Sequence, residues 1–241
     1  MVLLRGLRWQ RGISSKVNNT LARYFCIGSI GGPHLFQFIL LRFVSKNTNP
    51  AGLSRPESLY IEPYKIEMNI VLIFVSTVDG KVTKWGDPHV QRWSSQKDHD
   101  YFQKTWNDSE IIIMGSATFD VEPLPLSKDR ILVIMTGDPS KYKNKEVLGQ
   151  LEFTNETPKK LISRLKEGGF ERVLVVGGPH ISTSFLKDRL IDELWLTIEP
   201  RIFGSGGNFV TEEKLDINLY LKNYAKVNEE GTLILKYTVI K

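Results

Sequence analysis

The fold of this chain is decided by one stretch, residues 173–207, which reads VLVVGGPHISTSFLKDRLIDELWLTIEPRIFGSGG. Its first four residues are aliphatic, which predicts a strand that is buried on both faces. Two glycines end this strand, and Pro179 stands where the first turn of a helix would begin. Ile181, Phe185 and Leu186 then recur at helical spacing, and a second strand is expected over residues 193–198. The stretch therefore predicts a strand, a glycine turn, a helix and another strand.

The glycine turn at Gly177 and Gly178 is a candidate binding site for an anion. Glycine lets a ligand approach the backbone closely, and the N–H groups that open a helix lie at the positive end of its dipole. A phosphate or a diphosphate suits such a corner. The alternative is a tight packing turn that binds nothing, because a glycine pair after a strand is by itself an unspecific signal.

The charges of the chain are unevenly distributed along its length. The sequence has 241 residues with 32 Lys and Arg and 27 Asp and Glu, but residues 1–56 hold eight of the basic residues and none of the acidic ones. The remaining 185 residues therefore carry 24 basic and 27 acidic side chains, a net charge of −3. This body does not have the composition of a basic, nucleic-acid-binding surface, so we expect no nucleic-acid partner.

The sulfur and imidazole residues predict neither a disulfide framework nor a metal site. Cys26 is the single cysteine, so no disulfide can form within the chain and no cysteine cluster can bind zinc. The four histidines show no HExxH motif or paired spacing that would hold a metal. A reducing compartment fits this composition, and we expect the protein to be cytoplasmic.

Residues 1–67 form a basic leader, which we expect to be disordered or not part of the fold. Its Arg-rich composition, free of acidic residues up to Pro56, is that of an organelle transit peptide. Residues 24–41 are uncharged over about the length of a membrane span, but Gly, Pro, His and Gln interrupt them. A third alternative is that translation starts at Met68. We favour the late start or a disordered extension, and we expect no membrane partner.

Residues 68–241 predict a single α/β domain. Apolar runs expected to form strands cover residues 69–76, 110–114, 130–135, 151–154, 173–176 and 193–198. Helical patterns separate several of these runs, one of them capped by Ser94 or Ser95 and another by Thr157. Residues 232–240 alternate in polarity and predict a last, antiparallel strand. The pattern indicates a mostly parallel sheet with helices on both faces.

Two strand ends carry glycine turns that are followed by hydroxyl residues. The second of them, Gly115, Ser116 and Thr118, follows the strand over residues 110–114 and can form another anion-binding corner. Two such corners at one edge of a sheet fit a dinucleotide better than a mononucleotide. Ligands of open α/β sheets bind at the carboxyl ends of the strands, so residues 76–81 are expected to face a ligand as well. The alternative is that Asp79 and Gly80 simply form a turn.

Aromatic and acidic residues near this edge are weaker candidates. Trp85 and Trp93 lie in a loop, where they could line a flat pocket or cover the edge of the core. Asp98 follows on the next predicted helix, where carboxylates are more often solvated than functional. Each of these residues therefore keeps a structural alternative beside a substrate-binding role.

Over residues 68–241 the chain resembles the dihydrofolate reductase superfamily. Within it, the chain is similar to the reductase domain of riboflavin biosynthesis enzymes, the C-terminal domain of the bifunctional deaminase-reductase. The motifs that carry the resemblance are VSTVDGK at 75–81, IIIMGSATF at 111–119, VLVVGGPHI at 173–181 and LIDELWLTIEPRIFGSGG at 190–207. The last motif is the most specific, since its continuation after Glu199 and Pro200 looks like the riboflavin branch.

The resemblance implies a reductase that uses NADPH as its cofactor. It implies that one glycine corner carries the cofactor's diphosphate, that the other lies on the phosphate and adenosine side, and that the end of the third strand lies near the 2′-phosphate. Lys141 would be a charge partner there. The implied cofactor-binding residues are Ser76, Gly115, Ser116, Thr118, Thr136, Gly177, Gly178, Pro179 and His180.

The implied substrate is a small molecule, an aminopyrimidine with a phosphorylated ribose whose ribosyl group is reduced to ribityl. Asp79 and Glu199 are the expected catalytic residues, which orient this substrate, with one of them or a water as the source of the proton. The expected substrate-binding residues are Asp79, Lys81, Trp93, Asp98 and Glu199. Members of this branch are usually homodimers, and no metal is implied.

Departures from the family pattern keep two alternatives open. The deaminase signature is absent, and the segment FDVEPLPLSKDR after Thr118 lacks the continuation common in the riboflavin branch. Asp98 stands four residues before Phe102, which matches the helix carboxylate of the folate branch, so dihydrofolate reductase is the second hypothesis. The third is a member of the superfamily that binds a nucleotide without turning it over.

Overall fold

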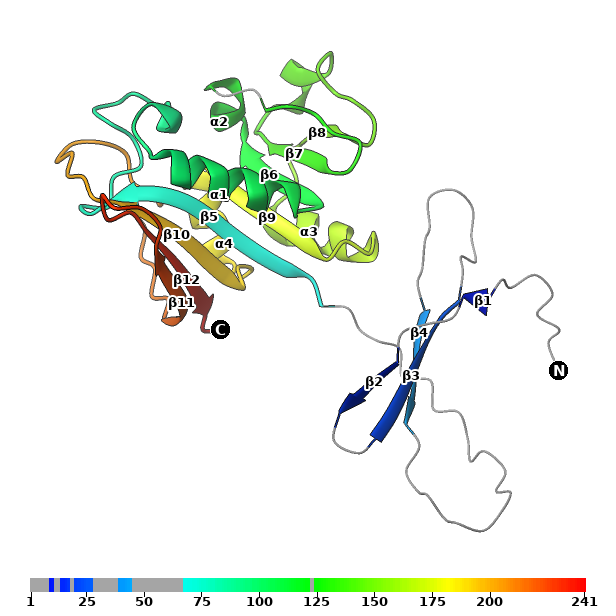
Figure 1. The fold of residues 1–241 in the computed structure, drawn as a ribbon. Helices are drawn as coiled ribbons and strands as arrows, with labels where there is room; N and C mark the ends of the chain where they lie inside the picture. Colours follow the sequence, from blue (N-terminus) through cyan, green and yellow to red (C-terminus); the bar gives the residue numbers. More distant parts are fainter. Residues whose placement is uncertain (1–8, 11–13, 18–19, 28–38, 45–66, 122–123) are drawn as a thin grey trace, which may run out of the picture. The chain divides into compact units, whose positions relative to one another are not determined.

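The computed structural model of the chain describes residues 9–10, 14–17, 20–27, 39–44, 67–121 and 124–241 (Figure 1). The chain divides into two compact units, Met1–Ile66 and Glu67–Lys241. In the first unit, β3 (Thr20–Ile27) pairs antiparallel with β1 (Trp9–Gln10), β2 (Ser14–Val17) and β4 (Ile39–Val44). The expectation that residues 1–67 are disordered or not part of the fold, with translation starting at Met68, stays a prediction.

The membrane alternative concerns residues 24–41, of which residues 28–38 lie outside the described residues. Within the part of the chain that the structure describes, no helix combines the length and the apolar character that a membrane crossing requires.

The second unit is built on one sheet of eight strands, in the order β11-β12-β10-β5-β9-β6-β7-β8 (Figure 1). The strands are β5 (Asn69–Thr77), β6 (Ile111–Gly115), β7 (Ile131–Met135), β8 (Leu151–Thr154), β9 (Arg172–Gly177), β10 (Glu193–Glu199), β11 (Leu219–Lys226) and β12 (Leu233–Val239). The six strands from β10 to β8 are parallel, whereas β12 runs antiparallel to β10 and β11 runs antiparallel to β12. The predicted fold class is confirmed.

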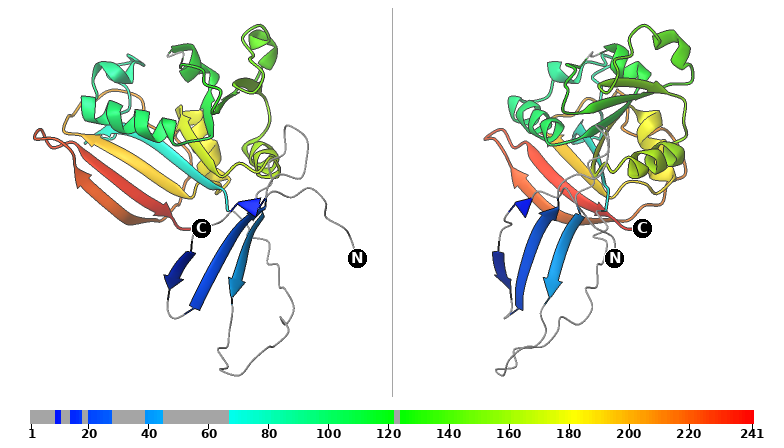
Figure 2. Two further views of the ribbon diagram at one scale, coloured as in Figure 1. Left: turned by 45° about the vertical axis from the view of Figure 1, so that its right-hand side comes forward. Right: turned by 90° about the vertical axis from the view of Figure 1, so that its right-hand side faces the viewer.

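Helices cover both faces of this sheet, as the two views of Figure 2 show. They are α1 (Gln96–Asn107), α2 (Ser116–Val121), α3 (Pro158–Glu167) and α4 (Pro179–Lys187), with two short 3₁₀ helices, η1 (Val90–Arg92) and η2 (Pro139–Tyr142). The predicted caps are confirmed, since Ser95 accepts from the N–H of Asp98 and Thr157 from that of Lys160. These caps fix where α1 and α3 begin.

Alternating side chains of the central strands feed two separate cores. Ile70 and Leu72 of β5 point into the core under α3 and α4, where Phe185 is fully buried. Their neighbours Val71 and Ile73 point into the core under α1 and α2. Because both faces are covered, the central strands consist almost entirely of aliphatic residues, which is why their runs are readable in the sequence.

The sequence predicted one antiparallel strand at the C-terminus, over residues 232–240, whereas the structure has two, β11 and β12. β12 buries Ile234 and Val239 and leaves its other residues half-buried, but every residue of β11 is exposed. Hydrophobic periodicity detects strands that bury one face, so β11 leaves no such signal. In the same way α2 was expected to be only a glycine turn with hydroxyls, because six residues are too few to show a helical period.

Candidate active site

The carboxyl ends of six strands meet at one edge of the sheet and hold the candidate site. The order of the strands fixes what lies where along this edge. Thr77 and Glu199 stand at the ends of β5 and β10, Gly177 and Gly115 at the ends of β9 and β6, and the ends of β7 and β8 lie beyond them. Parallel strands lie about 4.8 Å apart, so β10 and β9 are about 10 Å apart across β5.

Glu199 is buried at the end of β10, with only 2% of its surface exposed. The N–H of Ser95 donates to its Oε1 at 2.8 Å, and the hydroxyl of Thr232 donates to its Oε2 at 2.7 Å. These two donors lie in the segments before α1 and β12. Glu199 therefore joins the start of α1 to the sheet and holds a carboxyl group at the strand end.

Asp98 lies in the first turn of α1 and is also buried, with 7% of its surface exposed. Burial raises the pKa of its carboxyl group, while hydrogen bonds from the hydroxyls of Thr197 and Ser94 act in the opposite direction. The neighbouring charge of Glu199 raises this pKa further. The structure thus brings two predicted residues, Asp98 and Glu199, into one polar cluster inside the protein.

The hydroxyl groups around these carboxyls were not predicted. Thr197 is buried on β10, and Ser94 also lies 2.8 Å from Nε2 of His99. A signal for Thr197 exists in the sequence, because residues two apart on a strand share a face and Glu199 follows two positions later. The donors from Ser95 and Thr232 depend on long-range packing, which no local pattern shows.

Asp79 occupies a different position from these two carboxyls. It is exposed, and its carboxylate accepts hydrogen bonds from the Thr77 hydroxyl at 2.5 Å, from the N–H of Phe203 at 3.2 Å and from that of Gly204 at 2.7 Å. These hydrogen bonds, that of Thr77 first, lower the pKa of Asp79. The residue therefore ties the turn after β5 to the loop after β10.

Further contacts join these two loops, residues 77–85 and 201–208, into what we call the loop clasp. The N–H of Val82 donates to the carbonyl of Gly207, and the N–H of Gly207 donates to the Thr83 hydroxyl. Their donor–acceptor distances are 2.8 and 2.7 Å. A Cβ at Gly206, whose φ is +156°, would lie 2.0 Å from the Thr83 carbonyl oxygen. The glycines of the GSGG sequence thus permit close contact between two loops.

The aromatic residues of the loop after β5 take two different roles. Trp85 is exposed and donates its indole N–H to the carbonyl of Phe203 at 3.1 Å, as part of the loop clasp. Trp93 is buried and packs edge-on against the Phe203 ring, with centroids 5.1 Å apart. Its Nε1 is buried without a hydrogen-bond partner in the described part of the chain. Lys81, another predicted residue, bonds to Asn208 at 3.0 Å.

The glycine corner forms where the ends of β9 and β6 approach one another. A Cβ at Gly178 would lie 3.1 Å from the Thr118 hydroxyl, and one at Gly115 would lie 3.1 Å from the Ile181 side chain. Gly178 is the N-cap of α4, with no side-chain hydrogen bond to the first turn. Pro179 and His180 are exposed beside it. Gly177 is buried and Gly178 is half-buried, and no side chain caps the helix, so the first-turn N–H groups of α4 have no side-chain acceptor at the N-cap.

Two further predicted cofactor residues lie on or after neighbouring strands. Ser76 is buried on β5, where it pairs with Ile198 and points to the opposite face from Thr77 and Glu199. Thr136 follows β7, and its N–H donates to the carbonyl of Thr154 at 2.9 Å. Their roles, like those of the other predicted site residues, remain predictions.

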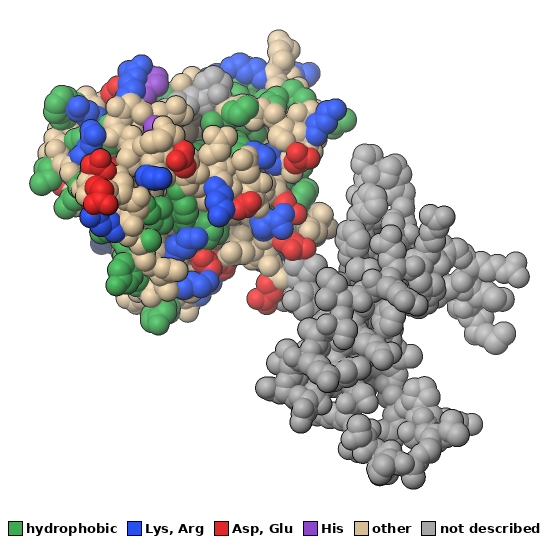
Figure 3. Space-filling model, viewed as in Figure 1, with side chains coloured by type: hydrophobic (Ala, Val, Ile, Leu, Met, Phe, Trp, Pro, Cys, Tyr) green, Lys and Arg blue, Asp and Glu red, His purple; other side chains and the backbone are tan. Residues whose placement is uncertain are grey.

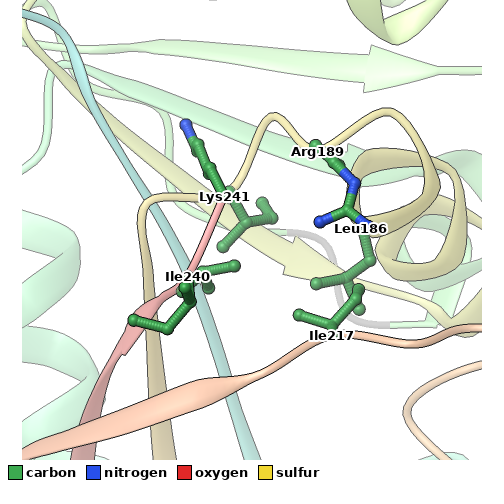
Figure 4. Close-up of a pocket in the computed structure, with 7 residues that line it drawn as sticks. Leu186, Arg189, Ile217, Ile240 and Lys241 are labelled. Carbon is green, nitrogen blue, oxygen red and sulfur yellow. The ribbon is translucent and has the colours of Figure 1, made fainter.

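No group of three or more His, Cys, Asp or Glu suited to a metal ion occurs among the residues for which the structure gives positions. A small apolar hollow, drawn in Figure 4, is lined by Leu186, Arg189, Ile191, Ile217, Val239, Ile240 and Lys241. It lies where α4 ends and β10 begins, at the amino end of the strand. It is therefore not part of the candidate site.

Two relatives match the chain over about the length of the second unit. The chain is 25% identical over 167 residues to uncharacterized protein YwjB of Bacillus subtilis, covering 65% of this chain and 91% of the relative. A second Bacillus subtilis protein, YyaP, matches at the same identity over 88% of its length. Neither name states an activity.

Solved structures share its fold. A pyrimidine reductase-like protein of Corynebacterium diphtheriae has a TM-score of 0.58 at 17% identity, over 73% of this chain and 93% of that one. The diaminohydroxyphosphoribosylaminopyrimidine deaminase/5-amino-6-(5-phosphoribosylamino)uracil reductase of Thermotoga maritima has a TM-score of 0.56 at 16% identity, over 73% and 58%. The model of one family, the RibD C-terminal domain, matches residues 69–233, which span the sheet from β5 to the first residue of β12. The chain belongs to the RibD C-terminal domain family, as its sequence motifs predicted.

Proposed function

We propose that the protein is a reductase that uses a reduced nicotinamide dinucleotide to reduce the ribosyl group of a ribosylaminopyrimidine phosphate. The observation that carries this proposal is the buried carboxyl pair, Asp98 and Glu199, about two strand spacings from the glycine corner. With its diphosphate at that corner, a dinucleotide would place its nicotinamide over the end of β5, beside the carboxyls. NADPH is the cofactor that the family resemblance implies.

The nicotinamide would supply the hydride in this reaction, and the protein has to bind the substrate, orient it and deliver a proton to it. Pyrimidine N–H and NH₂ groups are donors, and buried carboxyl groups are strong acceptors for them. Asp98 also holds its proton to higher pH than an ordinary aspartic acid, because it is buried beside Glu199. We therefore assign it to substrate binding and to proton delivery, and Glu199 to substrate orientation.

Asp79, expected from the sequence to be catalytic, has a carboxylate that already accepts three internal hydrogen bonds. We propose that it acts on the substrate through the loop clasp, by holding residues 77–85 beside the end of β5. Thr77 links the two regions, since its hydroxyl donates to Asp79 while its backbone pairs with Glu199 in the sheet.

A second candidate function is favoured by the position of Asp98. A carboxyl group in the first turn of α1 that accepts a hydrogen bond from Thr197 could equally hold a pterin ring, as the hypothesis of a dihydrofolate reductase requires. Purified full-length protein separates the two, because only the true substrate makes the nicotinamide absorbance at 340 nm fall. Saturable binding of the dinucleotide without oxidation by either substrate would instead support the non-catalytic hypothesis.

Two substitutions test the carboxyl pair. Asp98→Asn and Glu199→Gln are expected to lower turnover by about 100-fold or more while dinucleotide binding, measured by calorimetry, persists. Asp100→Asn, an exposed carboxylate on the same helix, is the matched control and should leave turnover unchanged. Unchanged turnover in both Asp98 and Glu199 variants would refute the assignment.

A further inference from the structure

The order of the strands indicates which end of the site would meet the adenosine of a bound dinucleotide. The carboxyl pair stands at β10 and the glycine corner at β9 and β6, so a dinucleotide that starts at the first and crosses the second continues toward β7 and β8. This step rests on the proposed function. The side chains that follow β7 and β8 then surround the adenosine ribose.

Asp138 is the acidic group that follows β7. Its Oδ1 accepts hydrogen bonds from the N–H and the hydroxyl of Ser140, at 3.1 and 2.5 Å, and so caps η2. These bonds lower the pKa of Asp138, so it is an anion at neutral pH. Since both bonds end on Oδ1, Oδ2 can accept from a ribose hydroxyl.

Two of the cations near this end are paired with carboxylates. Arg164 of α3 pairs with Glu152 of β8 and with Glu156, whose Oε2 lies 2.7 Å from its Nη2. Lys145 has Asp120 as its partner, 3.8 Å away. The neighbouring β6 end contributes Ser116, Ala117 and Thr118, which carry no charge.

Lys141, the expected charge partner of a 2′-phosphate, follows Asp138 by three residues at the end of η2. It is exposed, and it lowers the pKa of Asp138 through its charge. Its ammonium is therefore opposed by a carboxylate, and it offers no bidentate fork for a phosphate.

We propose that this end of the site selects against the 2′-phosphate, so that the protein binds NADH in preference to NADPH. In dinucleotide sites an acidic residue accepts from the 2′-hydroxyl of NAD, whereas an arginine accommodates the 2′-phosphate of NADP. Here the position after β7 holds an acid, and the arginine of the neighbouring element is already paired with two carboxylates. The chain thus differs from the NADPH dependence that its family resemblance implies.

Binding measurements on the full-length protein test this preference without any substrate. Calorimetric titrations with NADH and with NADPH at low salt are expected to give a dissociation constant for NADPH that is higher by about tenfold. Asp138→Asn should narrow this ratio by improving NADPH binding, while added salt should narrow it in the native protein by screening the repulsion. Asp129→Asn removes the same charge at the other end of β7 and should leave the ratio unchanged.

The outcomes separate this inference from the proposed function. If neither dinucleotide binds, the proposed function fails and the preference fails with it. If both bind and NADPH binds as tightly as NADH or more tightly, or if Asp138→Asn leaves the ratio where it was, the preference is refuted while the reductase proposal stands. A circular dichroism spectrum of each variant shows whether the fold persists.

Discussion

Replacing Gly206 by alanine is expected to open the loop clasp. The added Cβ would lie 2.0 Å from the Thr83 carbonyl oxygen, and that oxygen belongs to the backbone, so a rotamer change cannot relieve the contact. The φ of +156° adds strain, because this region of backbone space is used almost only by glycine and costs other residues about 1–3 kcal/mol. The loop over residues 201–208 must therefore move away from residues 77–85.

The size of the effect follows from the bonds nearest to Gly206. Moving the loop breaks the hydrogen bonds from Val82 to Gly207 and from Gly207 to Thr83, each worth about 0.5–1.5 kcal/mol. The loss of these two hydrogen bonds destabilises the closed clasp by about 1–3 kcal/mol relative to the open one, in addition to the backbone strain. Where opening is fast, proteolysis follows the open population, so cleavage within the clasp should rise about 5- to 150-fold.

Gly204→Ala provides a matched control in the same loop. Gly204 has a φ of +69°, so alanine there is strained as well, but its Cβ would meet nothing within 4 Å. Trypsin can cut after Lys81 and Lys84, and mass spectrometry identifies the fragments. The Gly206 variant should be cut faster than the Gly204 variant by about 5- to 150-fold. Both variants should still show a cooperative thermal unfolding transition. Equal cleavage of the two variants would refute the close packing of Gly206 against Thr83.

Three further predictions concern single side chains. Because the pKa of Asp98 is raised in the folded protein, its carboxyl group stabilises the fold fully below the unfolded pKa, near 3.8, and this stabilisation is lost as the pH rises through the folded pKa. In urea unfolding, Asp98→Asn should therefore lose less stability above pH 4 than the native protein or Asp100→Asn does. The lowered pKa of Asp79 has the opposite sign, so the destabilisation caused by Asp79→Asn should be present above about pH 4 and vanish as the solution is acidified through the folded pKa. Phe185→Ala, in the core under α4, should lower the free energy of unfolding by about 3–5 kcal/mol, and a loss below 1 kcal/mol would mean that this core is not closely packed.

The central sheet was predictable because local chemistry and tertiary structure agree there. Strands such as β6 and β9 are buried on both faces, so each is a continuous aliphatic run with a glycine at its end. The exposed strand β11 was missed because it buries none of its residues and pairs with β12 through the backbone, and backbone pairing leaves no trace in residue type. The prediction thus succeeded where burial selects side chains.

The candidate site was only partly predictable for a related reason. The glycine corner follows from a strand end and a helix start, whereas Glu199 and Asp98 were expected from the family resemblance, and the structure places these two carboxyls together. The role of Asp79 did not follow, because its partners Phe203 and Gly204 are more than 120 residues away along the chain. A turn that contacts a second loop has the same local sequence as one that does not, so only the arrangement of the two loops reveals the loop clasp.

The charges on the face that carries α1 (Figure 3) are mixed in sign, with basic, acidic and apolar side chains side by side. The mixed signs give no strong field of one sign on this face (Figure 3). Asp98 and Glu199 are buried among hydroxyls, where each hydrogen bond is strong, whereas Asp138 is exposed and its influence is screened by salt. The effect of substituting Asp98 or Glu199 should consequently not depend on ionic strength, whereas the effect of substituting Asp138 should become smaller as salt is added. Measuring both series over one range of salt concentration would show whether substrate and dinucleotide are recognised by these two distinct kinds of electrostatic contact.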